Sequence, residues 1–443
     1  RPIRRQAALG AAVTILLWTP FGGARAQPLA AAHLPASEQA SPWWRGYRDA
    51  MLDHMEDAAR SGNATLRAAL ARRAQADAAL AEVRGGWAPA ATISNSTAGG
   101  RAFAGGPAGG SNLAAITASW NLNLFGGLRR RIEAATADDA AALAAVEDTE
   151  RTVAADTAQA YFDACGTAVE LEAARRAVAA AETSDRIVAA QEAAGGVSRF
   201  DLTRSHATLA VARAALPPLE SQRSTAVNRL ATLTAQDAGE VERAVRRQAA
   251  PTLKDSIPSG DVTGRVRTRP DVRVAEQRLA ARTADVRVAI SDLYPTIAIG
   301  ASAQSLSGNG AAGASGLTFG YGPLISWSIP IPSVARAKVR QSKAVAAEAL
   351  ADFDGAVLNA LEDAKSALGA YSNAREHVAR LALARDRTAE ASDMAQRRYR
   401  DGGAGLLDLL QAQLAQASAD QALAGARRDQ ALAEVAVFKA LGG

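Results

Sequence analysis

Two very long helical stretches dominate the pattern of hydrophobic and polar positions along the 443-residue chain. Residues 131–194 contain one glycine and no proline, and residues 335–400 contain two glycines and no proline. Alanine is abundant in both, which favours helices that pack closely through small side chains. At about 1.5 Å per residue, about 60 residues span roughly 90 Å. We therefore predict long helices with coiled-coil-like packing.

A strict alternation of apolar and polar residues indicates two strands, each directly before one of these helices. Glycine-rich breaks at 98–111 and 305–316 are expected to separate each from an earlier strand, giving two hairpins. Pro330 and Pro332 are expected to end the second strand. The apolar positions are Ile116, Ala118, Trp120, Leu122 and Leu124 in the first strand, and Leu317, Phe319, Tyr321, Ile325, Trp327, Ile329 and Ile331 in the second.

This alternation has two physical interpretations. A soluble antiparallel sheet would turn its apolar face to a core, whereas an outer-membrane barrel would turn it to lipid. An export signal, the two hairpins and the aromatic residues Trp120, Phe319, Tyr321 and Trp327, which we expect to face lipid, favour the barrel. Four strands cannot close a barrel, which needs about eight, so the chain is expected to form an oligomer.

The two halves of the chain repeat one organisation. Trp120 and Trp327 are 207 residues apart, and so are Asp201 and Asp408. A constant offset at separate features indicates a tandem duplication. The expected parts are a signal peptide at 1–26, a first repeat at 27–235 with a helix, a β-hairpin and a long helical hairpin, a linker at 236–264, and a second such repeat at 265–443.

Glycine and proline mark the ends of the predicted helices. Pro217-Pro218 is expected to break the first return helix, and Pro270 to begin another helix. Ser198 is expected to cap the first return helix together with Asp201, as in a capping box. The residues of the two expected turns are Gly195, Gly196, Ser198 and Asp201 in the first half, and Gly402, Gly403 and Gly405 in the second.

The N-terminus resembles a secretory signal, with a basic stretch, an apolar stretch and Ala24-Arg25-Ala26 before Gln27. No later run of 18 apolar residues follows, so no transmembrane helix is expected. No cysteine stands at the end of this signal, so no lipid anchor is expected. The single cysteine, Cys165, is expected to be a buried structural thiol.

Charge and chemistry exclude several classes of function. The formal net charge is +5, but four positive residues lie within the signal, and basic and acidic residues alternate elsewhere, so no nucleic-acid partner is expected. The four histidines are isolated, so no metal site, cofactor or enzymatic activity is expected. The G-x-G-x-x-G pattern from Gly308 joins two strands, which predicts an extracellular loop rather than a nucleotide site.

Basic residues follow each strand at once. Their position favours a role at the inner surface of the outer membrane, where they would reach lipid head groups. The alternative is a solvated helix start, although cations there oppose the helix dipole. These candidates are Arg129, Arg130 and Arg131 in the first half, and Arg336, Lys338 and Arg340 in the second.

Several motifs together resemble the TolC-like outer-membrane efflux factors, and in particular the NodT-type channels of resistance–nodulation–division (RND) pumps. They are "PWWRGYRDAMLD", "SWNLNLFGG", "RPDVRVAEQRLAARTADV" with "LYPTIAIGA", "RRYRDGGAGLLDLLQAQ" and the final "VAVFKALGG". The resemblance implies a homotrimer in which four strands per chain close a twelve-stranded transmembrane β-barrel. The helical hairpins would form an α-barrel below it, with a closed tip that meets a periplasmic adaptor protein at the two turns.

The candidate gate at this tip is Leu407, Asp408 and Gln411. Threefold repetition would bring three copies of each together on the axis, where like charges repel. The alternative is a solvated Asp408 that favours the start of its helix. The family commonly has an acidic residue where Gln411 stands, so the usual ring of carboxylates is shifted or weakened here.

The expected function is that of a passive exit duct in the bacterial outer membrane, with a periplasmic extension. It would carry small molecules outward for an inner-membrane RND-type pump. A type I secretion duct for polypeptides is a second hypothesis, and a soluble periplasmic coiled-coil scaffold is a third.

Overall fold

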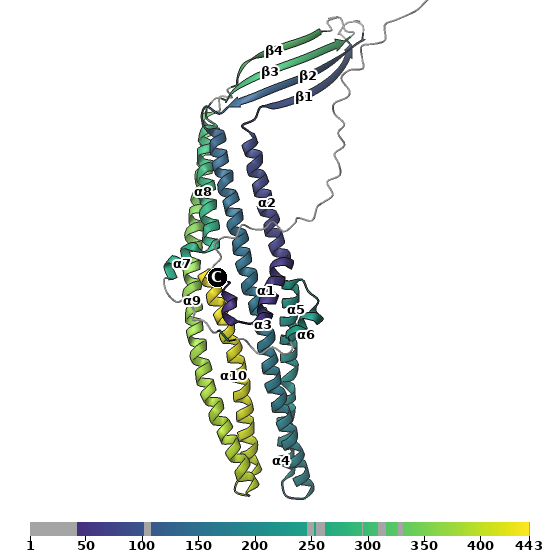
Figure 1. The fold of residues 1–443 in the computed structure, drawn as a ribbon, viewed down its shortest axis with the longest axis vertical. Coiled ribbons are helices and arrows are strands. Elements are labelled where there is room, and N and C mark those ends of the chain that lie inside the picture. The colour runs from purple at the N-terminus through teal and green to yellow at the C-terminus, as the bar shows by residue number, and fades with distance from the viewer. Residues whose placement is uncertain are drawn as a thin grey trace, which may run out of the picture. The chain divides into compact units, whose positions relative to one another are not determined.

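A computed structural model describes residues 42–101, 108–245, 252–253, 262–294, 296–308, 316–326 and 331–442. The helices and strands all belong to one unit, Trp43–Gly443 (Figure 1). The expected signal peptide at 1–26, Trp327 and the glycine-rich loop at 309–315 lie outside the described residues.

Two helices of 67 and 69 residues, α3 (Gly127–Ala193) and α9 (Pro332–Arg400), confirm the predicted long helices. The Asn123 Oδ1 atom accepts a hydrogen bond from the backbone N–H of Leu128 at the start of α3, at 2.9 Å. Proline in the first turn starts α9, where no backbone N–H is needed. Both helices therefore begin at local sequence signals.

The return helices differ between the two halves. In the first half, α4 (Arg199–Ala214) ends before the proline pair, and α5 (Leu216–Thr234) has the prolines in its first turn, as predicted. In the second half, α10 (Leu406–Leu441) runs unbroken beside the lower part of α9. The proline pair thus explains why one return helix is divided and the other is continuous.

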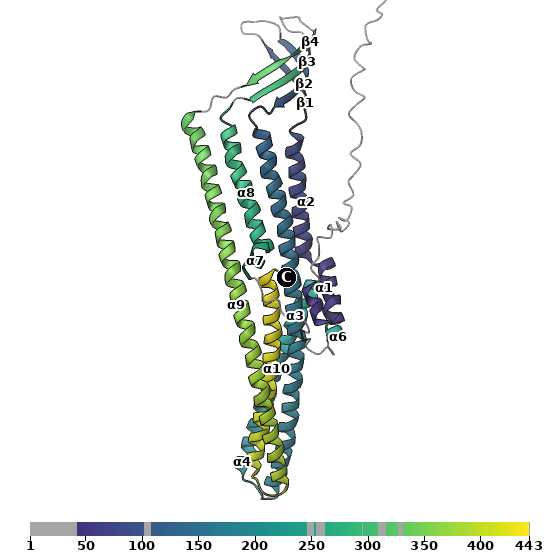
Figure 2. The same cartoon turned by 60° about the vertical axis from the view of Figure 1, so that its left-hand side comes forward.

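The remaining helices pack beside these long ones (Figure 2). The segment η1 (Trp43–Tyr47) leads into α1 (Ala50–Gly62) and then α2 (Ala64–Gly85), which packs on α3. The helix α8 (Pro270–Ser291), which begins at the predicted proline, packs between α3 and α9. Two short helices are α6 (Ala238–Val245) and α7 (Val262–Thr268). Both fall inside 236–268, at or next to the expected linker.

The strands form one four-stranded antiparallel sheet in the order β1-β2-β3-β4, at the end of the helices opposite the two turns (Figures 1 and 2). The strands are β1 (Ala90–Arg101), β2 (Ala108–Leu122), β3 (Thr296–Gly308) and β4 (Gly316–Ser326). Both expected hairpins are present, as β1–β2 and β3–β4, but they are parts of one sheet, because β2 pairs with β3 from Ser111↔Gly308 to Leu122↔Ile297.

The described parts of the two glycine-rich stretches, 98–101 and 108–111 in the first and 305–308 and Gly316 in the second, are strand. The ladder continues through Gly99↔Gly110 and Gly100↔Gly109. Strand pairing uses backbone groups, which glycine keeps, so a side chain is needed only where a face must pack. Ile331, expected in the second strand, instead directly precedes α9, because Pro332 favours the first turn of a helix.

The hydrophobic core lies halfway along the helices and joins segments from both ends of the chain. The ring of Trp43 stacks on Phe438 of α10 at 4.9 Å, and Tyr47 lies 4.9 Å from Phe162 of α3. Cys165 is a free, buried thiol, as predicted, and burial raises its pKa to about 12. The core residues from α5 and α6 include Val227, Leu230, Val241 and Val245.

Glu56 of α1 is a buried carboxyl group next to this core, with an exposed fraction of 0%. Within the described part of the chain, neither of its side-chain oxygens has a hydrogen-bond partner. Burial raises the pKa of Glu56 well above its ordinary value, with Arg60 opposing this shift. Burial therefore favours the neutral form of Glu56 in the folded protein, because ionisation without a partner is unfavourable.

Glu56→Gln is expected to make the protein relatively more stable as the pH rises. The unfolded chain ionises Glu56 above about pH 4.5 while the folded chain does not, so wild-type stability falls with pH by up to about 1.4 kcal/mol per unit until the raised pKa is passed. Melting temperatures in detergent at pH 5, 6.5 and 8 test this. The exposed Asp57→Asn is the control, and a constant difference between Glu56→Gln and wild type would contradict the prediction.

Candidate functional site

One face of the sheet is apolar across all four strands in the half that adjoins the helices, whereas its outer rows contain polar residues such as Asn95 and Ser305. The register aligns Ile93, Ile116, Ala303 and Phe319 in one row of neighbours. The adjacent rows on this face bring in Trp120 beside Ile299, and Tyr321 beside Ala301. Three of the four predicted lipid-facing aromatic residues, Trp120, Phe319 and Tyr321, therefore share one face. This face is open, with Phe319 71% and Tyr321 94% exposed.

The opposite face is mostly polar and small, apart from the neighbours Leu113 and Leu306 in its outer rows. Its rows include Thr92, Thr117 and Ser302 as direct neighbours, and the next row contains Ser94 and Gln304. A sheet with one apolar and one small polar face, both uncovered by this chain, suits a boundary between lipid and water. A soluble sheet would instead cover its apolar face with a core.

Aromatic side chains gather where the sheet meets the helices. The Trp120 indole Nε1–H donates to the backbone carbonyl of Trp87 at 2.9 Å. The rings of Phe125 and Tyr294 stack with centroids 5.1 Å apart. Trp87, Phe125 and Tyr294 were not predicted from the sequence. Each stands beside a strand end, and this shared position is the sequence signal that marks them.

The predicted basic residues lie at this same level, around two carboxylates. Asp292 accepts from Arg131 at 3.3 Å and from Lys338 at 2.6 Å, which brings the two predicted clusters together. Arg130 lies 2.6 Å from the carboxylate of Glu133 and lowers the pKa of that group through its hydrogen bond. The Nε atom of Arg129 lies 3.6 Å from the same carboxylate. Arg336 and Arg340 are exposed on the first turns of α9.

The two predicted turns lie together at the other end of the helices (Figure 1). Gly195 and Gly402 have φ of 75° and 73°, a left-handed conformation that favours glycine. The next residues, Gly196 and Gly403, donate to carbonyls of the preceding helices, which closes each turn. The predicted capping box is present, since Asp201 accepts from the Ser198 backbone N–H at 3.1 Å, and the Ser198 hydroxyl lowers the pKa of Asp201.

The candidate gate residues lie at the start of α10. Asp408 accepts from the backbone N–H of Gly405 at 3.2 Å and so satisfies a free donor of the helix start. Leu407 and Gln411 are exposed. Within one chain, Asp408 therefore has a capping role, and the side chains of Leu407 and Gln411 are free to meet another copy.

Two hydrogen bonds between helices hold the turn ends together, and the sequence did not reveal them. The Gln191 Nε2–H of α3 donates to the Tyr399 hydroxyl of α9 at 2.6 Å. The Ser184 hydroxyl of α3 donates to Gln413 Oε1 of α10 at 2.8 Å. Each of these residues is a single polar position in a charged helix, so no local sequence pattern marks it.

A groove of about 400 Å³ lies between α4 and α10 near this end. Alanines form much of its wall, and the side chains of Val211 and Leu414 are exposed in it. Arg204 and Gln421 add polar groups. An amphipathic helix could bury its apolar face in such a groove.

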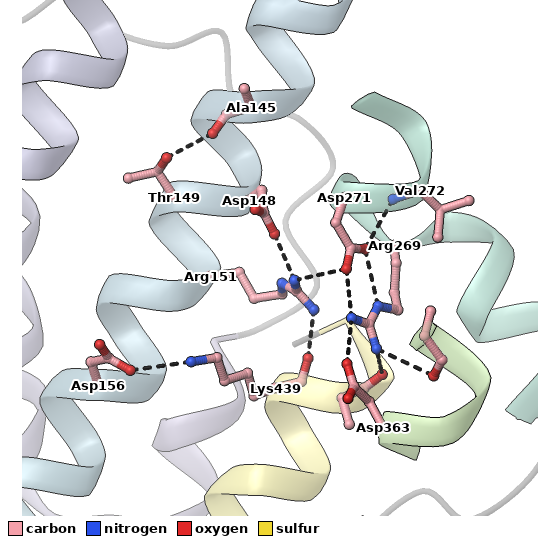
Figure 3. A network of polar contacts seen from close by, with 12 residues as sticks. Ala145, Asp148, Thr149, Arg151, Asp156, Arg269, Asp271, Val272, Asp363 and Lys439 are labelled. Carbon is pink, nitrogen blue, oxygen red and sulfur yellow. Dashed lines mark hydrogen bonds and ion pairs between the residues drawn. The ribbon is translucent and has the colours of Figure 1, made fainter. Parts of the chain in front are cut away.

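A polar network fixes the other end of α10 in the middle of the molecule (Figure 3). Arg269 is 4% exposed and holds Asp271 with two hydrogen bonds, of 3.0 and 2.5 Å. It also donates to the carbonyl of Ala440 at 2.9 Å and to Asp363 at 3.2 Å. Arg151 of α3 donates to the carbonyl of Lys439 at 2.6 Å. The two arginines thus satisfy the terminal carbonyls of α10 and tie it to α3, α8 and α9.

The described residues offer no group of three or more histidine, cysteine, aspartate or glutamate side chains arranged to hold a metal ion. Within the same residues, no helix combines the length and the apolar character required to cross a membrane.

Comparison with known proteins identifies relatives along most of the chain. A family model described as outer membrane efflux protein matches residues 56–236 and 266–443. Nodulation protein T of Rhizobium leguminosarum bv. trifolii is 28% identical over 383 residues, which are 84% of this chain and 81% of that protein. Outer membrane protein OprJ of Pseudomonas aeruginosa is 27% identical, over 73% of this chain and 68% of that protein.

A solved structure is similar over nearly the same extent. The outer-membrane channel OprN superimposes with a TM-score of 0.83 and 31% identity, covering 90% of this chain and 92% of that chain. The chain therefore belongs to the outer membrane efflux protein family, whose members are outer-membrane channels and not enzymes.

Proposed function

We propose that this protein is the passive outer-membrane exit duct of a tripartite efflux pump. It would carry small molecules from an inner-membrane RND-type pump to the exterior, with a periplasmic adaptor protein joining the two. The observation that carries the proposal is the uncovered apolar face of a four-stranded sheet, joined directly to long helices. Relatives named for pyoverdine export and toluene efflux support small molecules as cargo.

The working form in this proposal is a homotrimer with a twelve-stranded transmembrane barrel. The sheet has two free edges, β1 and β4, and a lipid environment does not allow unpaired edges. Four strands are too few to close alone, whereas three copies supply twelve. At about 100° per residue, the exposed side chains Leu350, Leu358, Leu383 and Met394 of α9 fall within about 80° of one another around the helix, which suits packing against a neighbouring copy in an α-barrel.

The proposed evolutionary origin is a tandem duplication, with repeats at 27–235 and 265–443, a linker at 236–264 and a signal peptide at 1–26. Gly195 and Gly402, 207 residues apart, share a left-handed φ. Asp201 and Asp408, at the same offset, each accept from a backbone N–H three residues earlier. Equal geometry at equal spacing supports two copies of one unit.

We assign the turn end to the periplasm, where the adaptor would dock. The docking residues in this proposal are those of the two turns together with the groove between α4 and α10. Leu407, Asp408 and Gln411 would surround the closed aperture on the threefold axis. The hydrogen bonds Gln191–Tyr399 and Ser184–Gln413 would hold the helix ends closed.

The opposite level, where strands become helices, would lie at the periplasmic surface of the outer membrane. Arg129, Arg130 and Arg131, with Arg336, Lys338 and Arg340, would face lipid head groups there. Aromatic residues beside them are typical of membrane–water interfaces.

A matched pair of lysine substitutions on β2 tests the membrane assignment. Ile116→Lys places a charge on the apolar face, which costs about 2–4 kcal/mol per copy near the middle of a bilayer. Thr117→Lys places the same charge on the polar face. We expect Ile116→Lys to deplete heat-modifiable trimers from the outer-membrane fraction, and Thr117→Lys to leave them.

Planar-bilayer conductance of the purified wild type completes this test. Channel activity is expected from wild type and from Thr117→Lys. Equal loss in both variants would argue against the assigned faces, and a wild type without any conductance would overturn the duct.

A further inference from the structure

A pocket of about 400 Å³ lies where the sheet joins α3 and α8. We call it the junction pocket and define it by Leu122, Phe125, Arg131, Asp292, Tyr294 and Ile297, which line it. Its lining includes apolar and aromatic side chains together with one cation and one carboxylate.

The apolar wall continues the apolar face of the sheet. Leu122 and Ile297 are direct neighbours at the last pair of the β2–β3 ladder, in the same set of rows as Trp120. The rings of Phe125 and Tyr294 stack at 10° between their planes, and both are exposed at 46% and 52%. A hydrocarbon chain lying on the sheet face would therefore reach the pocket without leaving an apolar surface.

Arg131 and Asp292 line the polar side of the pocket, and Lys338, which lies outside the lining, pairs with the same Asp292. Asp292 lies between Arg131 and Lys338, whose side chains are 58% and 59% exposed. Beside it, the carboxylate of Glu133 is shared by Arg129, Arg130 and Arg287. In these ion pairs of the described residues, five cations meet two carboxylates. An anion with several acceptor oxygens would complete the pairing of Arg131 and Lys338.

We propose that the junction pocket binds one phospholipid, with its phosphodiester on Arg131 and Lys338 and an acyl chain along Leu122, Phe125, Tyr294 and Ile297. The proposal rests on the proposed function, because it requires the sheet to lie in a membrane. A free phosphate offers similar acceptor oxygens but would leave the aromatic wall uncovered. We therefore assign the occupant to the lipid, whose two chemical parts match the two sides of the pocket.

Native mass spectrometry of the full-length, delipidated protein in detergent tests this assignment. The probes are palmitoyl-oleoyl phosphatidylglycerol, diacylglycerol with the same chains, and inorganic phosphate. Wild type is expected to retain phosphatidylglycerol, at one lipid per chain, and neither of the other two. Retention of diacylglycerol, or displacement of the lipid by millimolar phosphate, would overturn the proposal that the pocket recognises both the phosphodiester and the acyl chain.

Two variants with opposite expected effects separate binding from damage to the fold. Arg131→Gln with Lys338→Gln should weaken retention by roughly thirtyfold, the effect of two cations at a lipid surface. Asp292→Asn removes the competing carboxylate and should strengthen retention. Arg72→Gln with Lys365→Gln, on exposed parts of α2 and α9, makes the same change in net charge and should retain lipid as wild type does.

The outcomes distinguish this inference from the duct itself. Unchanged retention in both Asp292→Asn and the Arg131/Lys338 variant would overturn the pocket. So would a wild type that conducts in planar bilayers but retains no lipid, for example because a neighbouring copy covers the pocket. A wild type that neither conducts nor reaches the outer membrane would instead overturn the proposed function.

Discussion

Tyr399→Phe is expected to open the turn end of the channel, as a rise in its resting conductance. The substitution removes the hydroxyl that accepts from Gln191 at 2.6 Å, and the Gln191 Oε1 atom already lacks a partner among the described residues. One hydrogen bond contributes about 1 kcal/mol, so three copies in the proposed trimer contribute about 3 kcal/mol. The ratio of open to closed channels should then rise by about a hundredfold.

Single-channel recording in planar bilayers measures this ratio. Tyr371→Phe, on the same helix but halfway along the molecule, is the matched control and should leave the resting conductance unchanged. Ser184→Ala, which removes the bond to Gln413, should act in the same direction as Tyr399→Phe. A resting conductance equal to wild type in both variants would contradict a closing role for these bonds.

The same recording tests the candidate gate separately. Asp408→Ala and Gln411→Ala are expected to widen the aperture if three copies of each surround the axis. Asp408 also caps α10, so Asp408→Ala should lower the melting temperature as well. Loss of the cap lowers the free energy of unfolding by about 1 kcal/mol. An unchanged closed state in both variants would refute the gate at these residues and leave the duct standing.

Arg269→Met is expected to destabilise the protein by about 3–5 kcal/mol, which is the usual effect of removing one partner from a buried ionic network. The change leaves the carbonyl of Ala440 without its donor and removes the two hydrogen bonds that Arg269 donates to Asp271. Thermal unfolding in detergent measures the loss. Arg267→Met, on the exposed side of α7, is the matched control and should stay within about 0.5 kcal/mol of wild type.

Acid pH provides a second measurement on the same variant. Burial raises the pKa of Asp271, but its hydrogen bonds from Arg269 and the charge of Arg151 outweigh this and hold the pKa below its ordinary value of 3.8. This contribution is present above that value and is lost as the pH falls through the lowered pKa. The difference between wild type and Arg269→Met should therefore shrink in acid. Arg269→Lys should be intermediate, because lysine keeps the charge without the two parallel donors.

The long helices and their ends were predictable because their signals are local. Proline or glycine stands at the start of α3, α5, α8 and α9, and no proline interrupts the alanine-rich runs of α3 and α9. The apolar face of β2 and β4 was predictable for the same reason, since alternation assigns a face without a partner strand. The register then confirmed that Trp120, Phe319 and Tyr321 share it.

The pairing of β2 with β3 was not predictable from periodicity, because their residues are about 180 positions apart in the sequence. Contacts between single polar residues on different helices were not predictable for the same reason. Gln191 and Tyr399, or Asp292 and Lys338, carry no pattern that links them. Arg269 belongs to one of the motifs that resemble the family, but only the structure shows its role. It donates a hydrogen bond to the carbonyl of Ala440 at the end of α10.

The stacking of Trp43 on Phe438 sets the order in which the molecule can be completed. Rings 395 positions apart share one core, and the Tyr47 hydroxyl donates to Glu434 in the same place. A chain that is still entering the periplasm cannot complete this core before α10 has been translocated. Until then, the earlier helices expose their apolar faces. Protection by chaperones and exposure to proteases would be decided in that interval, and a shortened α10 would be degraded rather than inserted.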